Sequence, residues 1–194
     1  MRLFVGIALA DKVVRELAGA VARLRAKEGG PRVADNLRWT EPESWHITLQ
    51  FLGNASQEQY ECLAARLGEV RSAPVPIAVG ELGCFDRAGV LFANVTVTPE
   101  LAMLAQRVIA ATSRCGFVAD PRPFHSHITL ARAKAHGRGA GIRSMQNQVS
   151  LQPSFTPFVA SEFLLYESYT KPEGAKYEIR LRVPLASGAG AGYT

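Results

Sequence analysis

One tetrapeptide, His-Ile-Thr-Leu, occurs twice in this chain, beginning at His46 and again at His127. The chain has only four histidines, so chance would produce the second copy with a probability of roughly one in a thousand or less. In a β-strand, alternate side chains share a face, so each copy directs its histidine and threonine to one side and its isoleucine and leucine to the other. The repeat predicts two equivalent amphipathic strands whose apolar faces, including Phe51 in the first copy, are turned to a core.

The segments that surround the two motifs repeat as well. A strand, a helix and a second strand are predicted in each series: 3–9, 11–27 and 45–52 in the first, and 90–97, 99–115 and 124–132 in the second. Leu3-Phe4 and Leu91-Phe92 begin the two series alike. The chain therefore has the pattern of a duplicated strand-helix-strand module.

The rest of the chain adds further predicted elements: a short strand at 37–40, a helix at 57–71, and strands at 158–166 and 177–185. The basic stretch 132–143 contains glycine and lacks periodicity, which predicts a mobile loop. Residues 187–194 have the composition of a low-complexity tail. We expect residues 1–186 to form a single bilobal domain.

Composition narrows the class of protein. A chain of 194 residues with 47% hydrophobic content can bury its own core. Cys62, Cys84 and Cys115 are widely spaced and match no zinc or redox motif, which predicts neither a disulfide framework nor a metal clip and favours a reducing cytoplasm. The short apolar start is interpreted as a buried strand rather than a signal peptide. No run approaches the roughly 18 apolar residues of a membrane span, so a soluble cytoplasmic protein without membrane partners is expected.

The net charge of +5 arises mainly from arginines, whose guanidinium groups suit phosphate oxygens. A polyanionic partner would fit this charge. An arginine-rich surface can equally be an ordinary solvated surface. Charge supports a nucleic-acid partner and does not by itself establish one.

The paired motifs have the side chains that metal-free phosphoryl chemistry requires. In-line displacement at phosphorus needs a base for the attacking oxygen and an acid for the leaving oxygen, on opposite sides. If the modules meet about a pseudo-twofold axis, His46 and His127 supply these two sides. An imidazole titrates near pH 6.5, so one neutral and one protonated copy can coexist. The hydroxyls of Thr48 and Thr129 can donate to phosphate oxygens, and neither a metal nor a cofactor is required.

Alternative interpretations exist for some of these residues. A single motif could be explained as an amphipathic strand with a partly buried structural histidine. Two identical motifs at matching places make that explanation a poor one. His125 and His127 could together ligate a metal, although the nearest acidic residue in sequence is Asp120. Arg132 has the parity of Ile128, so a regular strand would point it away from His127, and only a strand end or a bulge would return it to contact phosphate.

The motif residues resemble the two-histidine phosphoesterase superfamily, whose hallmark is a doubled His-x-Thr/Ser-x motif. Within it, the sequence is similar to the bacterial and archaeal RNA 2′,3′-cyclic phosphodiesterases, formerly called 2′-5′ RNA ligases. The similarity lies in five segments: 1–7, 38–39, 45–53, 124–132 and 165–168. His125 is a departure from this subgroup, as is Ser126, which replaces a proline.

The resemblance implies a bilobal α+β fold with two facing antiparallel sheets and helices outside. It implies hydrolysis of a terminal 2′,3′-cyclic phosphate to a 2′-phosphomonoester, with His46 as the proton donor to the leaving 3′-oxygen and His127 as the proton acceptor that activates water. The expected partners are RNA with such an end or small cyclic nucleotides. The oligomeric state stays open, with a monomer expected.

Two rival functions remain. The same acid and base could join or cleave 2′-5′ linkages, because microscopic reversibility lets them close what they open. A nucleotide- or RNA-binding module could bind the same ligands without turnover, but such a module has no need for intact His46, Thr48, His127 and Thr129. The sequence therefore favours an enzyme.

Overall fold

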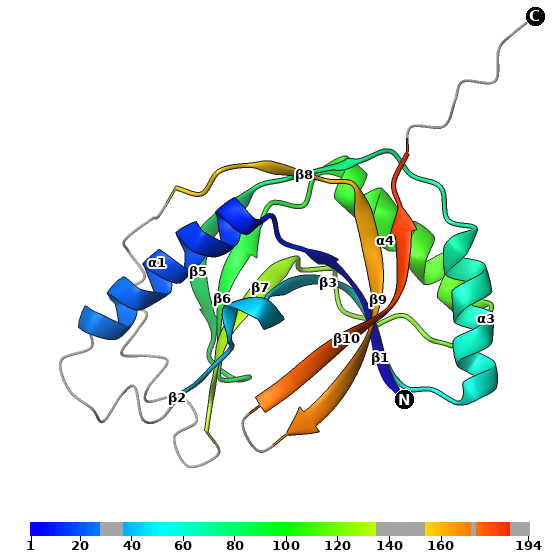
Figure 1. The fold of residues 1–194 in the computed structure, drawn as a ribbon, viewed down its shortest axis with the longest axis horizontal. Coiled ribbons are helices and arrows are strands. Elements are labelled where there is room, and N and C mark those ends of the chain that lie inside the picture. Colours follow the sequence, from blue (N-terminus) through cyan, green and yellow to red (C-terminus); the bar gives the residue numbers. More distant parts are fainter. Residues whose placement is uncertain (28–36, 135–153, 172–173, 187–194) are drawn as a thin grey trace, which may run out of the picture.

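The computed structural model describes residues 1–27, 37–134, 154–171 and 174–186 of the chain (Figure 1). The elements in chain order are β1 (Arg2–Ala8), α1 (Asp11–Lys27), β2 (Leu37–Trp39), η1 (Pro42–Ser44), β3 (His46–Asn54), α3 (Gln57–Gly68), β4 (Val75–Ile77), β5 (Val79–Phe85), β6 (Val90–Val95), α4 (Pro99–Ser113), β7 (His127–Ala133), β8 (Phe158–Ala160), β9 (Glu162–Lys171) and β10 (Gly174–Pro184). The two predicted series are both present, as β1, α1 and β3 and as β6, α4 and β7.

The strands form two antiparallel halves that meet at the motif strands. The strand order is β10-β9-β1-β3-β7-β6-β5, with β2 also paired to β7, while β4 and β8 form a separate pair. The two halves join where Ile47 of β3 pairs with Ile128 of β7, the second residue of each tetrapeptide. The predicted α+β fold is therefore confirmed, with both motif strands in the middle of the molecule (Figure 1).

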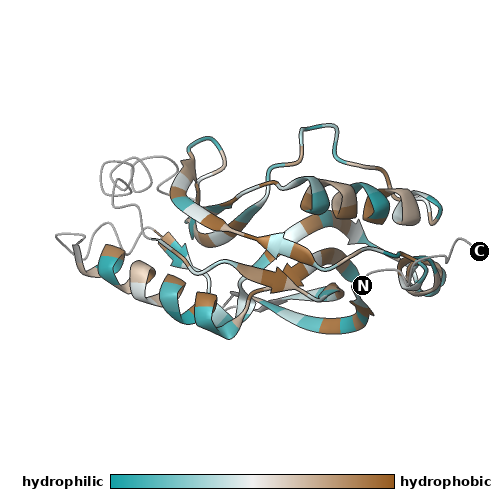
Figure 2. Ribbon diagram, turned by 90° about the horizontal axis from the view of Figure 1, so that it is seen from above, coloured by the Kyte–Doolittle hydropathy of each residue, from teal (hydrophilic) through white to brown (hydrophobic). Residues whose placement is uncertain are grey.

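The helices pack through the apolar stripes that their sequences predicted. In α1, buried side chains recur every three or four residues at Leu17, Val21 and Leu24, and hydrophobic and hydrophilic residues alternate around its turns (Figure 2). α4 of the second series buries Leu104 and Val108 and contacts β3 of the first series. None of the helices in the described ranges is both long and apolar enough to cross a membrane.

Some predicted boundaries agree with the structure and others do not. α1 begins and ends at the predicted residues, whereas the predicted helix 57–71 ends earlier, at Gly68. β4 and β5 were not predicted, because proline and glycine interrupt the strand pattern of residues 75–85. The predicted strand 158–166 is in fact two strands, β8 and β9, which lie in different sheets.

Two of the predicted irregular segments lie mainly outside the described residues. The predicted tail, 187–194, is wholly outside them, as is the part of the predicted loop from residue 135 onward. The first residues of that loop, Arg132 and Ala133, belong to β7. The strand therefore continues further than its sequence pattern indicated.

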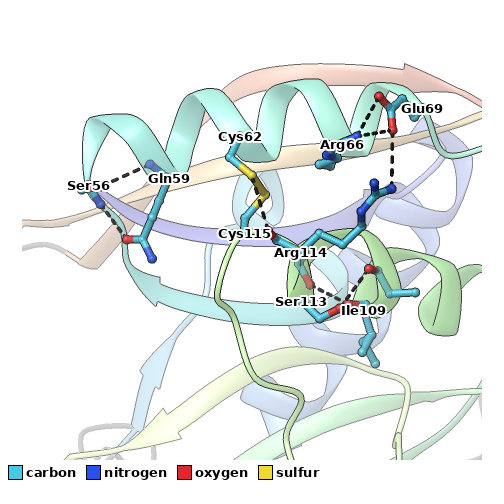
Figure 3. The surroundings of a disulfide bond; sticks show 11 residues. Ser56, Gln59, Cys62, Arg66, Glu69, Ile109, Ser113, Arg114 and Cys115 are labelled. Carbon is cyan, nitrogen blue, oxygen red and sulfur yellow. Dashed lines mark hydrogen bonds and ion pairs between the residues drawn. A yellow bond between two sulfur atoms is a disulfide. The ribbon is translucent and has the colours of Figure 1, made fainter.

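The prediction about the cysteines is wrong, because Cys62 and Cys115 form a disulfide (Figure 3). Cys62 lies in α3, and Cys115 follows α4, which packs against α3. The two residues are 53 positions apart and are brought together by the packing of α3 against α4. No short cysteine spacing in the sequence could therefore have indicated the bond. Since disulfides are uncommon in reducing compartments, the cysteines no longer argue for the cytoplasm, and that location stays a prediction.

Candidate active site

The two motif strands share one pattern of exposure and one irregularity. In His46–Asn54 and in His127–Ala133, half-buried and buried residues alternate over the tetrapeptide, then a second buried residue follows before an exposed one. A register shift against β1 leaves Leu49 as an extra residue in β3, and a shift against β6 does the same with Leu130 in β7. Each strand therefore has a β-bulge at the same place, which reverses the alternation beyond it.

The bulges bring Arg132 and Phe51 to the face of the histidines. Arg132 is exposed, and its positive charge contributes to lowering the pKa of both His46 and His127. Phe51, at the equivalent position of β3, is 66% exposed, and its ring centroid is 6.1 Å from that of Phe4. The prediction that Phe51 faces the core is wrong, because it assumed a regular strand.

Each motif histidine makes the same contact with its own backbone. Nδ1 of His46 lies 2.8 Å from the carbonyl oxygen of Ser44, and Nδ1 of His127 lies 2.8 Å from that of His125. A carbonyl oxygen only accepts hydrogen bonds, so Nδ1 carries the proton in both rings. Nε2 is left in each case as the nitrogen that gains or loses a proton, which suits a matched acid and base.

Aromatic rings surround both histidines. The ring centroid of His46 is 4.5 Å from that of Phe4 and 5.0 Å from that of Tyr177, which meets it edge-on. The ring of His127 is 5.3 Å from Phe85, also edge-on. These contacts fix the orientation of the imidazoles and remove them partly from water.

This burial changes the protonation of both rings. It lowers the pKa of His46 from 6.5 to about 4; the hydrogen bond to Ser44 opposes the shift, and the charges of His127 and Arg132 add to it. Burial is also the main cause that lowers the pKa of His127, against its hydrogen bond to His125. Both imidazoles are therefore largely neutral near pH 7 without a ligand. A phosphate anion beside them would raise both pKa values, because an opposite charge favours the protonated form.

The two motif threonines lie on the same face as the histidines. Thr48 and Thr129 are half-buried and precede the bulges, so the predicted alternation holds for them. Their Cα partners on neighbouring strands are Gly6 and Phe92. The structure thus gathers the predicted histidines, threonines and Arg132 on one face of the sheet.

These pairings correct the alignment of the two series. Because Gly6 pairs with Thr48 and Phe92 pairs with Thr129, Gly6 and Phe92 are equivalent positions. The sequence similarity had instead matched Phe92 with Phe4, which lies two residues earlier than Gly6 in β1. The second series therefore has a large ring where the first has no side chain.

Gly6→Ala is expected to destabilise the fold and slow turnover. A Cβ atom at Gly6 would lie 2.8 Å from the carbonyl oxygen of Ile47 and 3.5 Å from ring atoms of His46 and Tyr166. Overpacking of this kind costs about 1–3 kcal/mol of unfolding free energy. Denaturant unfolding and steady-state kinetics measure both effects. Gly68→Ala is the matched control, because its added methyl meets nothing within 4 Å apart from its chain neighbours and the backbone of its own helix; equal stability of the two variants would contradict the prediction.

His125 supplies its carbonyl to the site, while its side chain is exposed. Its ring centroid lies 5.8 Å from that of His127, and it also meets Phe85 edge-on. Asp120, the nearest acidic residue in sequence, pairs with Arg122. Across the part of the chain that the structure describes, no group of three or more His, Cys, Asp or Glu residues could hold a metal ion. The metal-ligand interpretation of His125 and His127 gains no support here.

The sequence interpretation missed the aromatic residues that enclose His46. Phe4 stacks on Tyr166, with ring centroids 4.8 Å apart. Burial raises the pKa of Tyr166 to about 12 and also raises that of Tyr177, while the charges of Arg132 and Arg2 oppose the latter shift. Both phenols are therefore neutral donors. Their strands were predicted, but only the tertiary pairing of β9 with β1, and of β10 with β9, brings these rings to the histidine.

The known proteins that are similar to this chain are phosphoesterases. A family model described as LigT like Phosphoesterase matches residues 10–92. An RNA 2′,3′-cyclic phosphodiesterase of Archaeoglobus fulgidus is 29% identical over 181 residues, which cover 92% of this chain and 97% of that protein. One of Aeropyrum pernix is 33% identical over 125 residues, which cover 61% of this chain and 68% of the relative.

The fold has a solved counterpart in Escherichia coli LigT. Its apo crystal structure superimposes with a TM-score of 0.76 at 25% identity and covers 96% of this chain and 98% of that one. The same E. coli protein has been solved in complex with 3′-AMP, with a TM-score of 0.72. From its sequence relatives and its fold, the chain belongs to the LigT-like RNA 2′,3′-cyclic phosphodiesterase family.

Proposed function

We propose that this chain hydrolyses the terminal 2′,3′-cyclic phosphate of RNA, or of small cyclic nucleotides, to a 2′-phosphomonoester. The observation that carries the proposal is the matched pair of histidines, each with Nδ1 fixed by a backbone carbonyl and Nε2 left to exchange a proton. The relatives named above are RNA 2′,3′-cyclic phosphodiesterases, which supports the proposal. Because each half contributes one histidine, we also propose that residues 1–186 act as one phosphoesterase domain.

In the proposed mechanism the two histidines act on opposite sides of phosphorus. Nε2 of His127 takes a proton from water as the water oxygen attacks, and the bond from phosphorus to the 3′-oxygen breaks. Nε2 of His46 gives its proton to that leaving oxygen, so the 2′-phosphate remains. Arg132 and the hydroxyls of Thr48 and Thr129 stabilise the charge on the non-bridging oxygens.

Incubation with an oligonucleotide that ends in a 2′,3′-cyclic phosphate tests the proposal directly. The end group of the product is identified by chromatography and by its response to phosphomonoesterase, with a chelator present throughout. A 2′-phosphate supports the proposal. A 3′-phosphate would reverse the identity of the leaving oxygen, while RNA that binds unchanged would make the protein a binding module.

Thr48→Val and Thr129→Val are each expected to lower kcat/KM by about 10- to 150-fold, which corresponds to about 1.5–3 kcal/mol for a hydrogen bond to a charged group. Valine preserves the shape and the strand propensity, so the fold should survive. Hydrolysis of a nucleoside 2′,3′-cyclic phosphate measures the effect. Thr96→Val makes the same chemical change at an exposed position outside the motifs. If both motif variants hydrolyse at the wild-type rate, neither hydroxyl contacts the phosphate.

The pH profile of kcat/KM should have its maximum below pH 6.5. This parameter reports the free enzyme, in which burial holds the pKa of His46 near 4 and that of His127 below its ordinary value. Activity needs one proton on the pair, so it falls as that proton is lost with rising pH. The profile of kcat should lie at higher pH, because the bound phosphate anion raises both pKa values. Coincident profiles centred above pH 6.5 would contradict this account.

A further inference from the structure

A cavity of about 340 Å³ opens beside His46, at the end of the histidine face. Its walls come from three places that are far apart in sequence: the start of α1, the turn η1, and strands β9 and β10. Pockets for small organic molecules are usually about 300–1,000 Å³. The cavity is therefore large enough for a nucleobase, and it lies in contact with a residue of the proposed mechanism.

The chemistry of the walls suits an uncharged, flat ligand rather than a phosphate. Tyr166 and Tyr177 present aromatic rings, and Ile179 remains 42% exposed although it is a large apolar residue. The charged members of the described lining are Asp11 and Glu43, both acidic. Carboxylates would repel a phosphate but can accept hydrogen bonds from the N–H groups of a base.

The geometry of a cyclic phosphate fixes the side on which its nucleoside lies. Both bridging oxygens belong to one ribose, so the histidine that protonates the leaving 3′-oxygen must lie beside that ribose. In the proposed function this histidine is His46. The base attached to the same ribose then lies on the side of His46, where the cavity is. On the side of His127, the position equivalent to Gly6 is filled by Phe92, which stacks on Phe85.

We propose that this cavity is the binding site for the terminal nucleobase of the substrate, and that Glu43 and Asp11 favour bases with amino groups over uracil. The base lies against Tyr177 and Ile179, and its amino group donates to the carboxylates. This inference rests on the proposed function, since it takes the side of the ribose from the role of His46. It adds a base preference to that function.

A pair of substrates separates base binding from the reaction itself. Guanosine 2′,3′-cyclic phosphate carries a base, whereas the 2′,3′-cyclic phosphate of 1-O-methylribose has a methoxy group in its place. Stacking of one base on aromatic side chains is worth about 1–3 kcal/mol, or about 5- to 150-fold. We expect kcat/KM of the wild-type protein to be higher for the guanosine substrate by at least about fivefold.

Ile179→Trp fills the cavity and should bring that ratio of kcat/KM values towards one. Val159→Trp is the matched control, because Val159 is an exposed β-branched residue on β8, outside the cavity, and should keep the ratio. If Ile179→Trp still hydrolyses both substrates and the ratio stays at the wild-type value, the inference is overturned. If the wild-type protein hydrolyses neither substrate, the proposed function itself fails.

Glu43→Gln tests the acidic wall without changing its size. Wild-type protein should prefer guanosine 2′,3′-cyclic phosphate to the uridine compound, and the variant should reduce this preference several-fold, since an amide is a weaker acceptor than a carboxylate. Glu43 is exposed, so the variant should fold even if Ile179→Trp does not. An unchanged guanosine-to-uridine ratio would contradict the proposed contact between Glu43 and the amino group of the base.

Discussion

Replacing His46 or His127 by alanine is expected to lower kcat by about 10²–10⁴, the usual effect of removing one general acid or base. The two losses should be similar in size, because each ring supplies one Nε2 and is held by an equivalent carbonyl contact. RNA binding should persist through Arg132 and the remaining residues of the histidine face, since phosphate contacts dominate nucleic-acid affinity. Single-turnover hydrolysis and a fluorescence binding titration measure the two properties separately.

The pH profiles of these variants test which histidine has which role. In the wild-type profile, the acidic limb reflects protonation of the base, and the alkaline limb reflects loss of the proton from the acid. His127→Ala should therefore abolish the acidic limb, and His46→Ala the alkaline one. The opposite result would exchange donor and acceptor. Near-normal turnover by either variant would end the two-histidine mechanism.

His125→Ala is the control for a histidine change close to the site. Alanine keeps the backbone carbonyl that accepts from Nδ1 of His127, while it removes an exposed ring. The variant should retain most of the wild-type rate and both limbs of the profile. A loss as large as that of His127→Ala would give the His125 ring a direct role.

The repeated tetrapeptide was sufficient to predict the duplicated series and the face that carries His46 and Thr48, because alternation is local to a strand. It was insufficient for Phe51 and Arg132, which lie beyond the bulges. A bulge depends on the register against a neighbouring strand, here β1 for one motif and β6 for the other. Strand parity therefore places side chains correctly only up to the first irregularity.

The aromatic surroundings of His46 show the same limit on a larger scale. Tyr166 and Tyr177 come from strands more than a hundred residues further along the chain, and β9 reaches β1 only in the folded sheet. The sequence predicted these strands but contained no signal for their order. Gly6 likewise has an explanation only when the paired strand β3 is in place, because a Cβ atom there would lie 2.8 Å from the carbonyl oxygen of Ile47.

Removal of the Cys62–Cys115 disulfide is expected to lower the free energy of unfolding by about 4 kcal/mol. The bond closes a loop between residues 53 positions apart, and loop-closure entropy for that length gives this value. For a domain of this size, the loss corresponds to a decrease in Tm of about 10 °C. Thermal unfolding of the wild-type protein with and without a reductant, and of Cys62→Ala/Cys115→Ala, measures it. Cys84→Ala is the control that should keep the full response to reductant.

Turnover by the folded protein should change far less than stability, by no more than about twofold at 25 °C, because the bond acts mainly on the unfolded chain. The disulfide ties α3 to the end of α4 (Figure 3). α4 in turn contacts the motif strand β3 through Thr112, whose hydroxyl lies 2.7 Å from Oε1 of Gln50. That buried contact does not need the disulfide. If reduction lowers kcat as well as Tm, α4 holds the bulge of β3, and with it the histidine face, in place. If reduction leaves Tm unchanged, the loop-closure account of this bond is wrong.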